Sequence, residues 1–391
     1  MKASKRSTIR AALMTALMLV ITVASTRLRA DTGTCGGASI TLPFADVAAG
    51  NIFFCSIAEA YFSGLSNGTD ATHYTPSANV TREQMAAFVT RTMDQSLRRR
   101  SRRAALKQFW TPTSTDGLGL TTVGTTPQLI ASDGADLWVA NNGSGTVSRV
   151  RASDGKVLSE STGAASAFGI LAAKGAIWVT GQTSPGKLYI MDPAVGSVST
   201  LPVSLGNSPG QLSFDGARIW TANQGGSVSI VTLNPLSVST VTAGFSSPRG
   251  ILYDGANIWV TDYTAGRLFK LDSNGAIIQS VVTGAFPLYS VFDGTNIWAP
   301  NNIDNTVTVV RASTGAVLAE LSANGLSGPT AAAFDGERIL VTNGLSVSLW
   351  KAADLSPIGI VSTGLNAPFG ACSLGPNFWI ALYTTNKLAR F

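Results

Sequence analysis

Alternating apolar and polar positions recur in phase along the C-terminal two thirds of the chain. One ten-residue stretch shows the pattern best, and its versions read SDGADLWVAN from Ser132, FDGARIWTAN from Phe214, YDGANIWVTD from Tyr253, FDGTNIWAPN from Phe292 and FDGERILVTN from Phe334. The aromatic residue of this stretch recurs every 39 to 42 residues, at Trp138, Trp178, Trp220, Trp259, Trp298 and Trp379, with Leu340 in its place once. A proline six residues before the Asp keeps the same phase in six units, and Phe168 stands in its place in the other unit. Two markers in phase over seven units indicate an internal repeat.

Each unit predicts four short strands. In the fourth unit, GILY, IWVTD, GRLFKLD and AIIQSVVTG have the alternation of strands, and Asp-Gly and Asn-Gly turns between them supply the positive φ that a hairpin needs. Four strands per unit, with the aromatic residue in the second strand, are typical of β-propeller blades. The predicted fold class is mainly β: a seven-bladed β-propeller with four-stranded blades, preceded by a small α-helical module.

The end of the repeat predicts how the ring closes. The seventh unit stops after its third strand, NKLARF, and residues 119–127, GLTTVGTTP, resemble the fourth strands of other units. This N-terminal strand would complete the last blade and leave no open edge. We therefore place the propeller at residues 118–391, after a linker at residues 104–117.

The repeats resemble the NHL/YVTN-repeat, virginiamycin-B-lyase-like superfamily of seven-bladed propellers, through P-x-G…DG-x-x-IWV-x-N units over residues 127–391. The resemblance implies a fold and leaves the activity open, because propellers host many unrelated functions. The lyases of that superfamily use a histidine base and a metal in the channel, whereas the single histidine of this chain, His73, precedes the propeller. Without the usual base for neutral pH, we expect a propeller with no catalytic residue, metal or cofactor.

Two sets of loops are expected to open on one face of the propeller, before strand one and between strands two and three. They would supply a rim rich in amides and tyrosine: Asn142, Gln182, Gln224, Arg249, Asp262, Tyr263, Asn302 and Tyr383. Such a rim suits hydrogen bonding to a neutral glycan or a peptide. Structural roles are expected for the repeated turn residues Asp133, Asp215, Asp254, Asp293 and Asp335 and for the strand-end residues Asn141, Asn223, Asn301 and Asn343.

Residues 41–103 predict a helical module with a basic extension. Helical periodicity appears in FFCSIAEAYF and in TREQMAAFVTRTM, where Thr81 is placed as the N-cap. The pieces FADV, IAEAYFSGLSNG and YTPSANVTREQMAAFV resemble an S-layer homology (SLH) motif. The resemblance implies attachment to envelope polysaccharide or peptidoglycan through Asp46 and Arg82. The alternative is a helical module that only caps the N-terminus.

Residues 1–30 have the basic, apolar and small-residue order of a secretory signal peptide. They hold six Lys/Arg and no Asp/Glu, so the formal net charge of +6 lies entirely within them. The remaining chain is near neutral, which removes any hint of a nucleic-acid partner. The alternative is an uncleaved anchor, although its fifteen apolar residues from Ala11 to Ser25 fall short of a bilayer span; after cleavage no transmembrane span is expected.

Exported proteins can keep disulfides, and Cys35 with Cys55 is the candidate pair because both lie in one small region. Cys372 stands in a column of small and apolar residues, which predicts a buried free thiol. Five arginines between Arg98 and Arg103 are either a solvated helix extension or a contact with acidic polysaccharide or lipid.

Together these features predict an exported protein at the cell surface, in the periplasm or in the cell wall. The SLH-like module would attach it to the envelope, and the propeller would bind glycan or protein. Two alternatives stay open. One is a secreted lyase or lactone hydrolase with a carboxylate-bound metal in the channel, for which Asp262 is the acidic candidate, and the other is a self-assembling surface-layer subunit.

Overall fold

The structure is a computed structural model that describes residues 31–35, 38–99, 119–362, 364–375 and 377–390. The predicted signal peptide at residues 1–30 and the predicted linker at residues 104–117 lie outside the described residues, as do Arg100, Arg102 and Arg103 of the basic run. No helix in these described ranges combines the length and apolar character needed to cross a bilayer.

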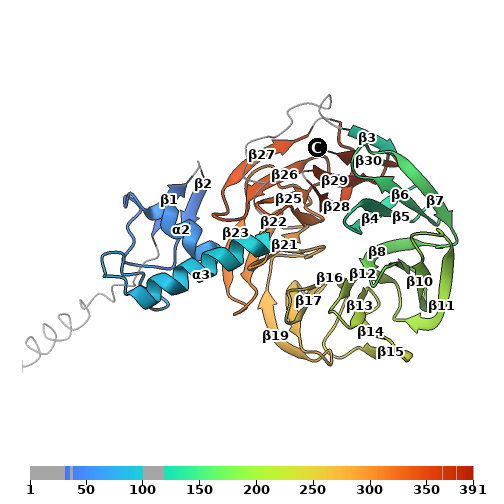
Figure 1. Ribbon diagram of the computed structural model, residues 1–391, viewed down its shortest axis with the longest axis horizontal. Helices are drawn as coiled ribbons and strands as arrows, with labels where there is room; N and C mark the ends of the chain where they lie inside the picture. Colours follow the sequence, from blue (N-terminus) through green and yellow to red (C-terminus); the bar gives the residue numbers. More distant parts are fainter. Residues whose placement is uncertain (1–30, 36–37, 100–118, 363, 376, 391) are drawn as a thin grey trace, which may run out of the picture.

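Seven four-stranded antiparallel sheets stand around a central axis as the blades of a propeller (Figure 1). Blade one consists of β4 (Pro127–Ser132), β5 (Asp136–Asn141), β6 (Thr146–Arg151) and β7 (Val157–Thr162). Blade two consists of β8 (Ala167–Ala173), β9 (Ala176–Gly181), β10 (Gly186–Met191) and β11 (Val198–Leu205). Blade three consists of β12 (Pro209–Phe214), β13 (Arg218–Asn223), β14 (Ser227–Leu233) and β15 (Leu236–Val241).

The remaining blades follow in chain order around the ring. Blade four consists of β16 (Pro248–Tyr253), β17 (Ile258–Asp262), β18 (Arg267–Leu271) and β19 (Ile277–Val282). Blade five consists of β20 (Val291–Phe292), β21 (Asn296–Asn301), β22 (Thr306–Arg311) and β23 (Val317–Leu321). Blade six consists of β24 (Ala332–Phe334), β25 (Arg338–Thr342), β26 (Val347–Lys351) and β27 (Pro357–Val361). Blade seven consists of β28 (Pro368–Leu374), β29 (Asn377–Leu382), β30 (Lys387–Arg390) and β3 (Gly119–Thr122).

Strand β3 closes the ring, as the sequence predicted. It pairs with β30 in antiparallel register, with Gly119 opposite Arg390 and Thr122 opposite Lys387. Buried side chains of blades one and seven, among them Leu137, Val150 and Trp379, then form one hydrophobic cluster. The two ends of the propeller are therefore held together both by the strand pairing and by a shared core.

One hydrogen-bond pattern explains why Asp and Trp recur five residues apart. In blade four, one carboxylate oxygen of Asp254 accepts the backbone N–H groups of Ala256 and Asn257, and the other accepts the indole N–H of Trp259 at 2.7 Å. The same indole bond joins Asp133 to Trp138, Asp215 to Trp220 and Asp293 to Trp298. Blade six has Leu340 in place of Trp, and Asp335 pairs with Arg338 instead. The predicted turn role of these aspartates is confirmed, and in four blades it lets the Trp ring be buried with its one polar atom satisfied.

Glycine in the first strand of a blade allows the inner strands to approach one another. A Cβ added at Gly250 would lie 2.6 Å from the carbonyl oxygen of Leu288 in the next blade. Instead, the hydroxyl of Thr261 donates to that same carbonyl at 2.6 Å. Neighbouring blades are therefore joined close to the axis by backbone-to-side-chain hydrogen bonds as well as by apolar contacts.

Residues 32–99 form the N-terminal module, with a hairpin of β1 (Thr32–Cys35) and β2 (Ala38–Thr41) and the helices α2 (Phe54–Phe62) and α3 (Arg82–Arg99). Both helices lie where helical periodicity placed them. Thr81 and Gln84 cap α3 reciprocally, each side chain accepting the other's backbone N–H, at 3.2 and 2.8 Å. The hairpin was not predicted and precedes the expected start at residue 41. A disulfide between Cys35 and Cys55 joins it to α2, so the hairpin belongs to the module.

The N-terminal module packs against blades five and six (Figure 1). Phe44 and Phe62 of the module share one buried cluster with Trp298, Val309 and Trp350 of the propeller. Helix α2 ends at this interface, where blade five provides donors for two of its carbonyl groups and for that of the C-cap residue, Ser63. Arg311 donates to Tyr61, Asn296 to Phe62 at 2.8 Å and Thr295 to Ser63 at 3.3 Å. The propeller therefore satisfies carbonyls that a helix end leaves without intrahelical partners.

Candidate functional site

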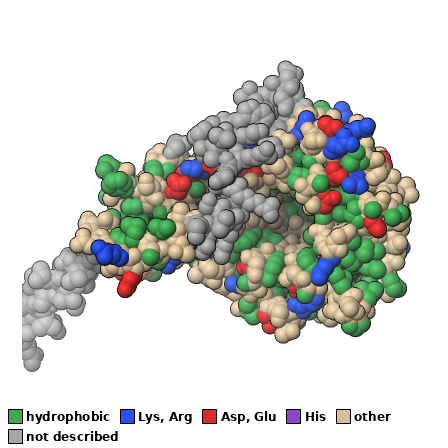
Figure 2. Space-filling view, in the orientation of Figure 1, with side chains coloured by type: hydrophobic (Ala, Val, Ile, Leu, Met, Phe, Trp, Pro, Cys, Tyr) green, Lys and Arg blue, Asp and Glu red, His purple; other side chains and the backbone are tan. Residues whose placement is uncertain are grey.

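A cavity of about 650 Å³ lies at the centre of the propeller. Two repeated positions supply most of its lining: the residue after the first-strand proline position, in six blades, and the residue four places after the motif aromatic, in all seven. The first position, here named the inner ring, contributes Gln128, Phe168, Arg249, Leu288, Thr330 and Phe369. The second position, here named the outer ring, contributes Asn142, Gln182, Gln224, Tyr263, Asn302, Gly344 and Tyr383. Figure 2 shows one face of the propeller, which is hollowed near its centre with hydrophobic side chains at the edge of the hollow.

The strand register corrects the alignment of blade two. Ala167 lies opposite Gly181, as Pro209 lies opposite Asn223 in blade three. Ala167 therefore takes the place of the proline, and Phe168, which the sequence put there, belongs to the inner ring. In blade two the turn glycine, Gly175, stands three residues before the Trp rather than four, so counting back from this glycine misplaced the residue by one.

A repeated backbone hydrogen bond positions the outer ring. The N–H of Tyr263 donates to the carbonyl of Ser247, the residue before the proline, at 3.0 Å. The equivalent bonds, at 2.9 to 3.0 Å, join Asn142 to Thr126, Gln182 to Ser166, Gln224 to Ser208, Asn302 to Phe286 and Tyr383 to Ala367. The end of strand two is thus fixed to the start of strand one in these blades, so the outer-ring side chains are held at the cavity by the fold itself.

In blades one, three, five and six the residue immediately before the outer-ring position is an asparagine with a structural role. Asn141 is buried and donates from its side-chain amide to Thr146 and Ser148 of the next strand, at 3.1 and 2.8 Å. The amides of Asn223, Asn301 and Asn343 make the equivalent bonds. These contacts agree with the expectation that this column of asparagines is structural.

Asp262 belongs to this structural column, so its prediction as a rim residue was wrong. Its side chain is buried, and its carboxylate accepts the backbone N–H groups of Ser246, Ser247 and Ala265 at 2.7, 3.0 and 3.1 Å. Successive residues of a strand point to opposite sides, so Tyr263 faces the cavity and Asp262 does not. The carboxylate that was the candidate metal ligand of a lyase therefore already accepts hydrogen bonds from three backbone donors.

The cavity combines aromatic surface with amides and one cation. Phe168, Tyr289, Phe369 and Tyr383 form a continuous aromatic group, with ring centroids 5.6 to 6.2 Å apart. The guanidinium of Arg249 lies 4.7 Å from the ring centroid of Tyr263, which in turn stacks on Phe286 at 4.2 Å. None of the described lining residues is Asp or Glu. The side-chain charge on the lining is thus a single positive one.

Three polar atoms of the lining are buried without a hydrogen-bond partner. They are Oε1 of Gln128, Nε2 of Gln224 and Nε of Arg249. Gln128 is only 6% exposed, so bulk water reaches little of its side chain. Buried polar atoms are rarely left unpaired in proteins, and three of them line this cavity, which makes it the candidate site for a ligand.

The sequence assigned every outer-ring residue except Gly344 to the rim, but it assigned almost none of the inner ring. Arg249 was assigned from its loop, whereas Gln128, Phe168, Leu288, Thr330 and Phe369 were missed. The residue after each proline was the available signal, because the repeat phase already fixed that column.

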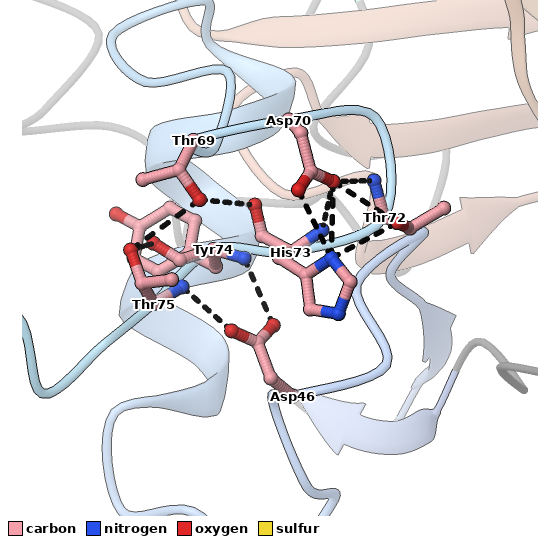
Figure 3. Close-up of polar contacts among 7 residues, drawn as sticks. All are labelled: Asp46, Thr69, Asp70, Thr72, His73, Tyr74 and Thr75. Atoms are coloured by element: carbon pink, nitrogen blue, oxygen red, sulfur yellow. Dashed lines mark hydrogen bonds and ion pairs between the residues drawn. The ribbon is translucent and has the colours of Figure 1, made fainter.

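The N-terminal module holds the two residues assigned to polysaccharide binding, Asp46 and Arg82. In Figure 3 the carboxylate of Asp46 points at the backbone N–H groups of Tyr74 and Thr75, which it accepts at 2.8 and 2.6 Å. Burial opposes ionisation of Asp46, but these backbone donors outweigh it and lower its pKa. Arg82 is exposed at the start of α3. Asp46 therefore fixes the loop that precedes α3, and Arg82 is the freer of the two for an external ligand.

The single histidine lies in the same loop. Its Nδ1 is 3.0 Å from one carboxylate oxygen of Asp70, and the other oxygen accepts the backbone N–H of Thr72 at 2.7 Å (Figure 3). The N–H of Thr72 and the ring of His73 together lower the pKa of Asp70 to about 2. His73 is thus engaged in a surface turn of the module.

In the described ranges, no reactive cysteine and no cluster of metal-ligating residues marks a second candidate site. Cys372 is free, and burial raises the pKa of its thiol to about 12, so the nucleophilic thiolate does not form near neutral pH. No group of three or more His, Cys, Asp or Glu residues that could hold a metal ion occurs within the described part of the chain.

Comparison with known proteins agrees with the architecture. No protein-family model matches the chain, and no curated protein matches it. Virginiamycin B lyase from Staphylococcus aureus is similar in structure, with a TM-score of 0.60 and 16% identity over 70% of this chain and 98% of that chain. A streptogramin B lyase structure has a TM-score of 0.60 and 16% identity over 70% of this chain and 96% of that chain. Hydrazine synthase of Kuenenia stuttgartiensis has a TM-score of 0.58 and 18% identity over 69% of this chain and 96% of that chain.

These likenesses show the fold alone. They confirm the resemblance to virginiamycin-B-lyase-like propellers as a resemblance of architecture, with seven four-stranded blades in a mainly β chain. A propeller of this kind offers a surface on which a ligand can bind. The SLH resemblance of the N-terminal module finds no matching family model.

Proposed function

We propose that the protein is an exported cell-envelope protein whose propeller binds carbohydrate in its central cavity. The N-terminal module would attach the chain to envelope polysaccharide. The observation that carries the proposal is the composition of the cavity, in which side-chain amides and aromatic rings meet at the propeller axis.

The cavity lining matches the chemistry of a sugar ring. Amide side chains carry both donors and acceptors, and they can pair with hydroxyl groups that also do both. The aromatic group of Phe168, Tyr289, Phe369 and Tyr383 offers apolar faces to the C–H surfaces of a pyranose. A largely apolar pocket with a few convergent polar groups is also the usual form of a small-ligand site.

A glycan array probed with the purified protein tests carbohydrate binding. We expect a subset of glycans to bind and the signal to fall in Gln224→Ala and Tyr383→Ala, which remove a hydrogen-bonding group and an aromatic face. Gln279→Ala is the matched control, because Gln279 lies on the outer strand β19, away from the cavity lining. A protein that melts as a folded chain and binds no glycan would contradict the proposal.

The attachment part of the proposal rests on Arg82 and on the SLH-like sequence around it. A guanidinium can make a charge-assisted contact with an acidic envelope sugar, so Arg82→Ala should release the protein from sedimented cell-wall material. Arg151→Ala is the control, since Arg151 pairs with Asp154 on the outer surface of blade one. Equal sedimentation of Arg82→Ala and the parent would show that the module attaches by other means or not at all.

A further inference from the structure

We infer that the cavity selects saccharides that carry a carboxylate, and that Arg249 binds this group. The inference rests on the proposed carbohydrate function and adds the charge of the ligand to it. It can fail while carbohydrate binding stands, because neutral sugars would fit the amides and aromatic rings equally well.

Arg249 lines the cavity without an anionic partner. Its Nε is buried and has no hydrogen-bond partner. No Asp or Glu occurs among the described lining residues, and none of the ion pairs between described residues involves Arg249. A buried donor that lacks an acceptor is costly, and the planar fork of a guanidinium fits the two oxygens of a carboxylate. A bound carboxylate would satisfy both the hydrogen bond and the charge.

The guanidinium is also held in position before a ligand arrives. It lies over the ring of Tyr263, and that ring is stacked on Phe286 with an angle of 17° between the planes. The backbone N–H of Tyr263 is itself fixed to Ser247 at 3.0 Å. A donor that is already ordered loses less conformational entropy on binding, so this stack favours recognition at a defined point of the cavity.

The charge of the site matches a single carboxylate. Arg249 is the only Lys or Arg among the described lining residues. Burial raises the pKa of the neighbouring Tyr289, while the charge of Arg249 acts in the opposite direction. The phenol therefore stays neutral and does not compensate the guanidinium. One positive charge balances one carboxylate, whereas a phosphate dianion would bring an excess negative charge into the cavity.

The rest of the lining favours a saccharide as the carrier of that carboxylate. Oε1 of Gln128 and Nε2 of Gln224 provide an unpaired acceptor and an unpaired donor. Sugar hydroxyl groups can serve both, and the aromatic group can cover one face of a sugar ring. A peptide carboxyl terminus could reach Arg249, but it would use the aromatic group only if its last side chains were apolar.

The test compares acidic sugars with their esters. The full chain is titrated with oligosaccharides that contain hexuronate or sialate residues, and with the methyl esters of the same compounds, which keep the sugar and remove the charge. We expect the acid form to bind about 10- to 100-fold more tightly than the ester. Arg249→Gln should reduce this preference to near unity, Arg249→Lys should keep part of it, and Arg151→Gln should leave it unchanged. Thermal melting checks that each variant is folded.

Each contrary outcome has its own meaning. Equal binding of acids and esters, or a preference that survives Arg249→Gln, overturns the inference and leaves carbohydrate binding intact. Binding of no saccharide of either form overturns both the inference and the proposed function. Binding of peptides through a free C-terminal carboxylate, dependent on Arg249 and without any saccharide binding, overturns the assignment of the ligand as a sugar.

Discussion

The turn positions and the cavity positions of the propeller recur with the same period but differ in how much their residues vary from blade to blade. At the turn, five blades carry the same residue, Asp, and the four that also have Trp make the same indole bond. At the outer ring the seven blades contribute Asn, Gln, Gln, Tyr, Asn, Gly and Tyr. Turn contacts are made within one blade, so the same residue can make the same contact in several blades. Cavity contacts point toward a shared axis, where a single ligand meets a different side chain from each blade.

This comparison shows how to separate structure from function in a repeat protein. Positions that stay the same from unit to unit build the unit, and positions that vary at the axis are free to determine the ligand. Asp262 and Tyr263 show how local the division is. They are adjacent in sequence, yet one is buried under three backbone donors and the other lines the cavity.

The largest effect is expected from opening the ring itself. Deleting residues 119–126 removes β3, leaves β30 without its partner and exposes part of the core shared by blades one and seven. We expect a loss of at least about 4 kcal/mol in the free energy of unfolding, and a melting temperature lower by roughly 10 °C. Aggregation should accompany it, since β30 becomes an open edge. A deletion variant that melts with the parent would show that β3 does not close the ring in solution.

The second prediction sets one turn residue against one cavity residue. Asp254→Ala removes three hydrogen bonds and leaves the buried indole N–H of Trp259 without an acceptor. We expect this to cost about 2–3 kcal/mol of stability, with ligand binding preserved in the folded protein. Gln224→Ala should change stability by no more than about 0.5 kcal/mol and act on binding. Chemical denaturation measures the stability of both variants, and a glycan-binding assay measures their affinity. Equal losses of stability in the two variants would contradict the distinction between turn and cavity positions.

A third prediction concerns pH and the turn positions. Burial opposes ionisation of Asp215, but the backbone N–H of Arg218 and the indole N–H of Trp220 outweigh it, so the pKa of Asp215 in the folded protein lies below its ordinary value. The stabilising contribution is complete above the ordinary pKa of about 4 and is lost as pH falls through the lowered folded value. Melting curves between pH 7 and pH 3 should show less acid destabilisation in Asp215→Asn than in the parent. Identical pH profiles would contradict this role.

The repeat let the sequence predict the blades, the closure of the ring and the outer ring of the cavity. These features depend on local periodicity, which one chain displays seven times. The interface of the N-terminal module could not be predicted in this way. Its donors are Thr295, Asn296 and Arg311, which meet helix carbonyls more than two hundred residues away. Blade four has Asn257 where blade five has Asn296, and blade one has Arg151 where blade five has Arg311, so the repeat does not single these donors out. The hairpin of β1 and β2 was missed because its strands are only four residues long and their residue types, TGTC and ASIT, show no clear apolar–polar alternation, although burial alternates along β1.

Filling the cavity while leaving the strands of the blades unchanged tests most directly whether the ligand binds there. Gly344 is the outer-ring residue that has no side chain, and a Cβ added there meets no heavy atom closer than 3.5 Å, from the carbonyl oxygen of Ser327. Gly344→Trp should therefore place an indole in the cavity, and Gly50→Trp in the N-terminal module is the control, because an added Cβ there meets nothing within 4 Å. Glycan binding and melting of both variants are compared with the parent. We predict that Gly344→Trp keeps its melting temperature within about 2 °C and loses glycan binding, while Gly50→Trp keeps both. Full glycan binding by folded Gly344→Trp would contradict the claim that the ligand binds in the central cavity.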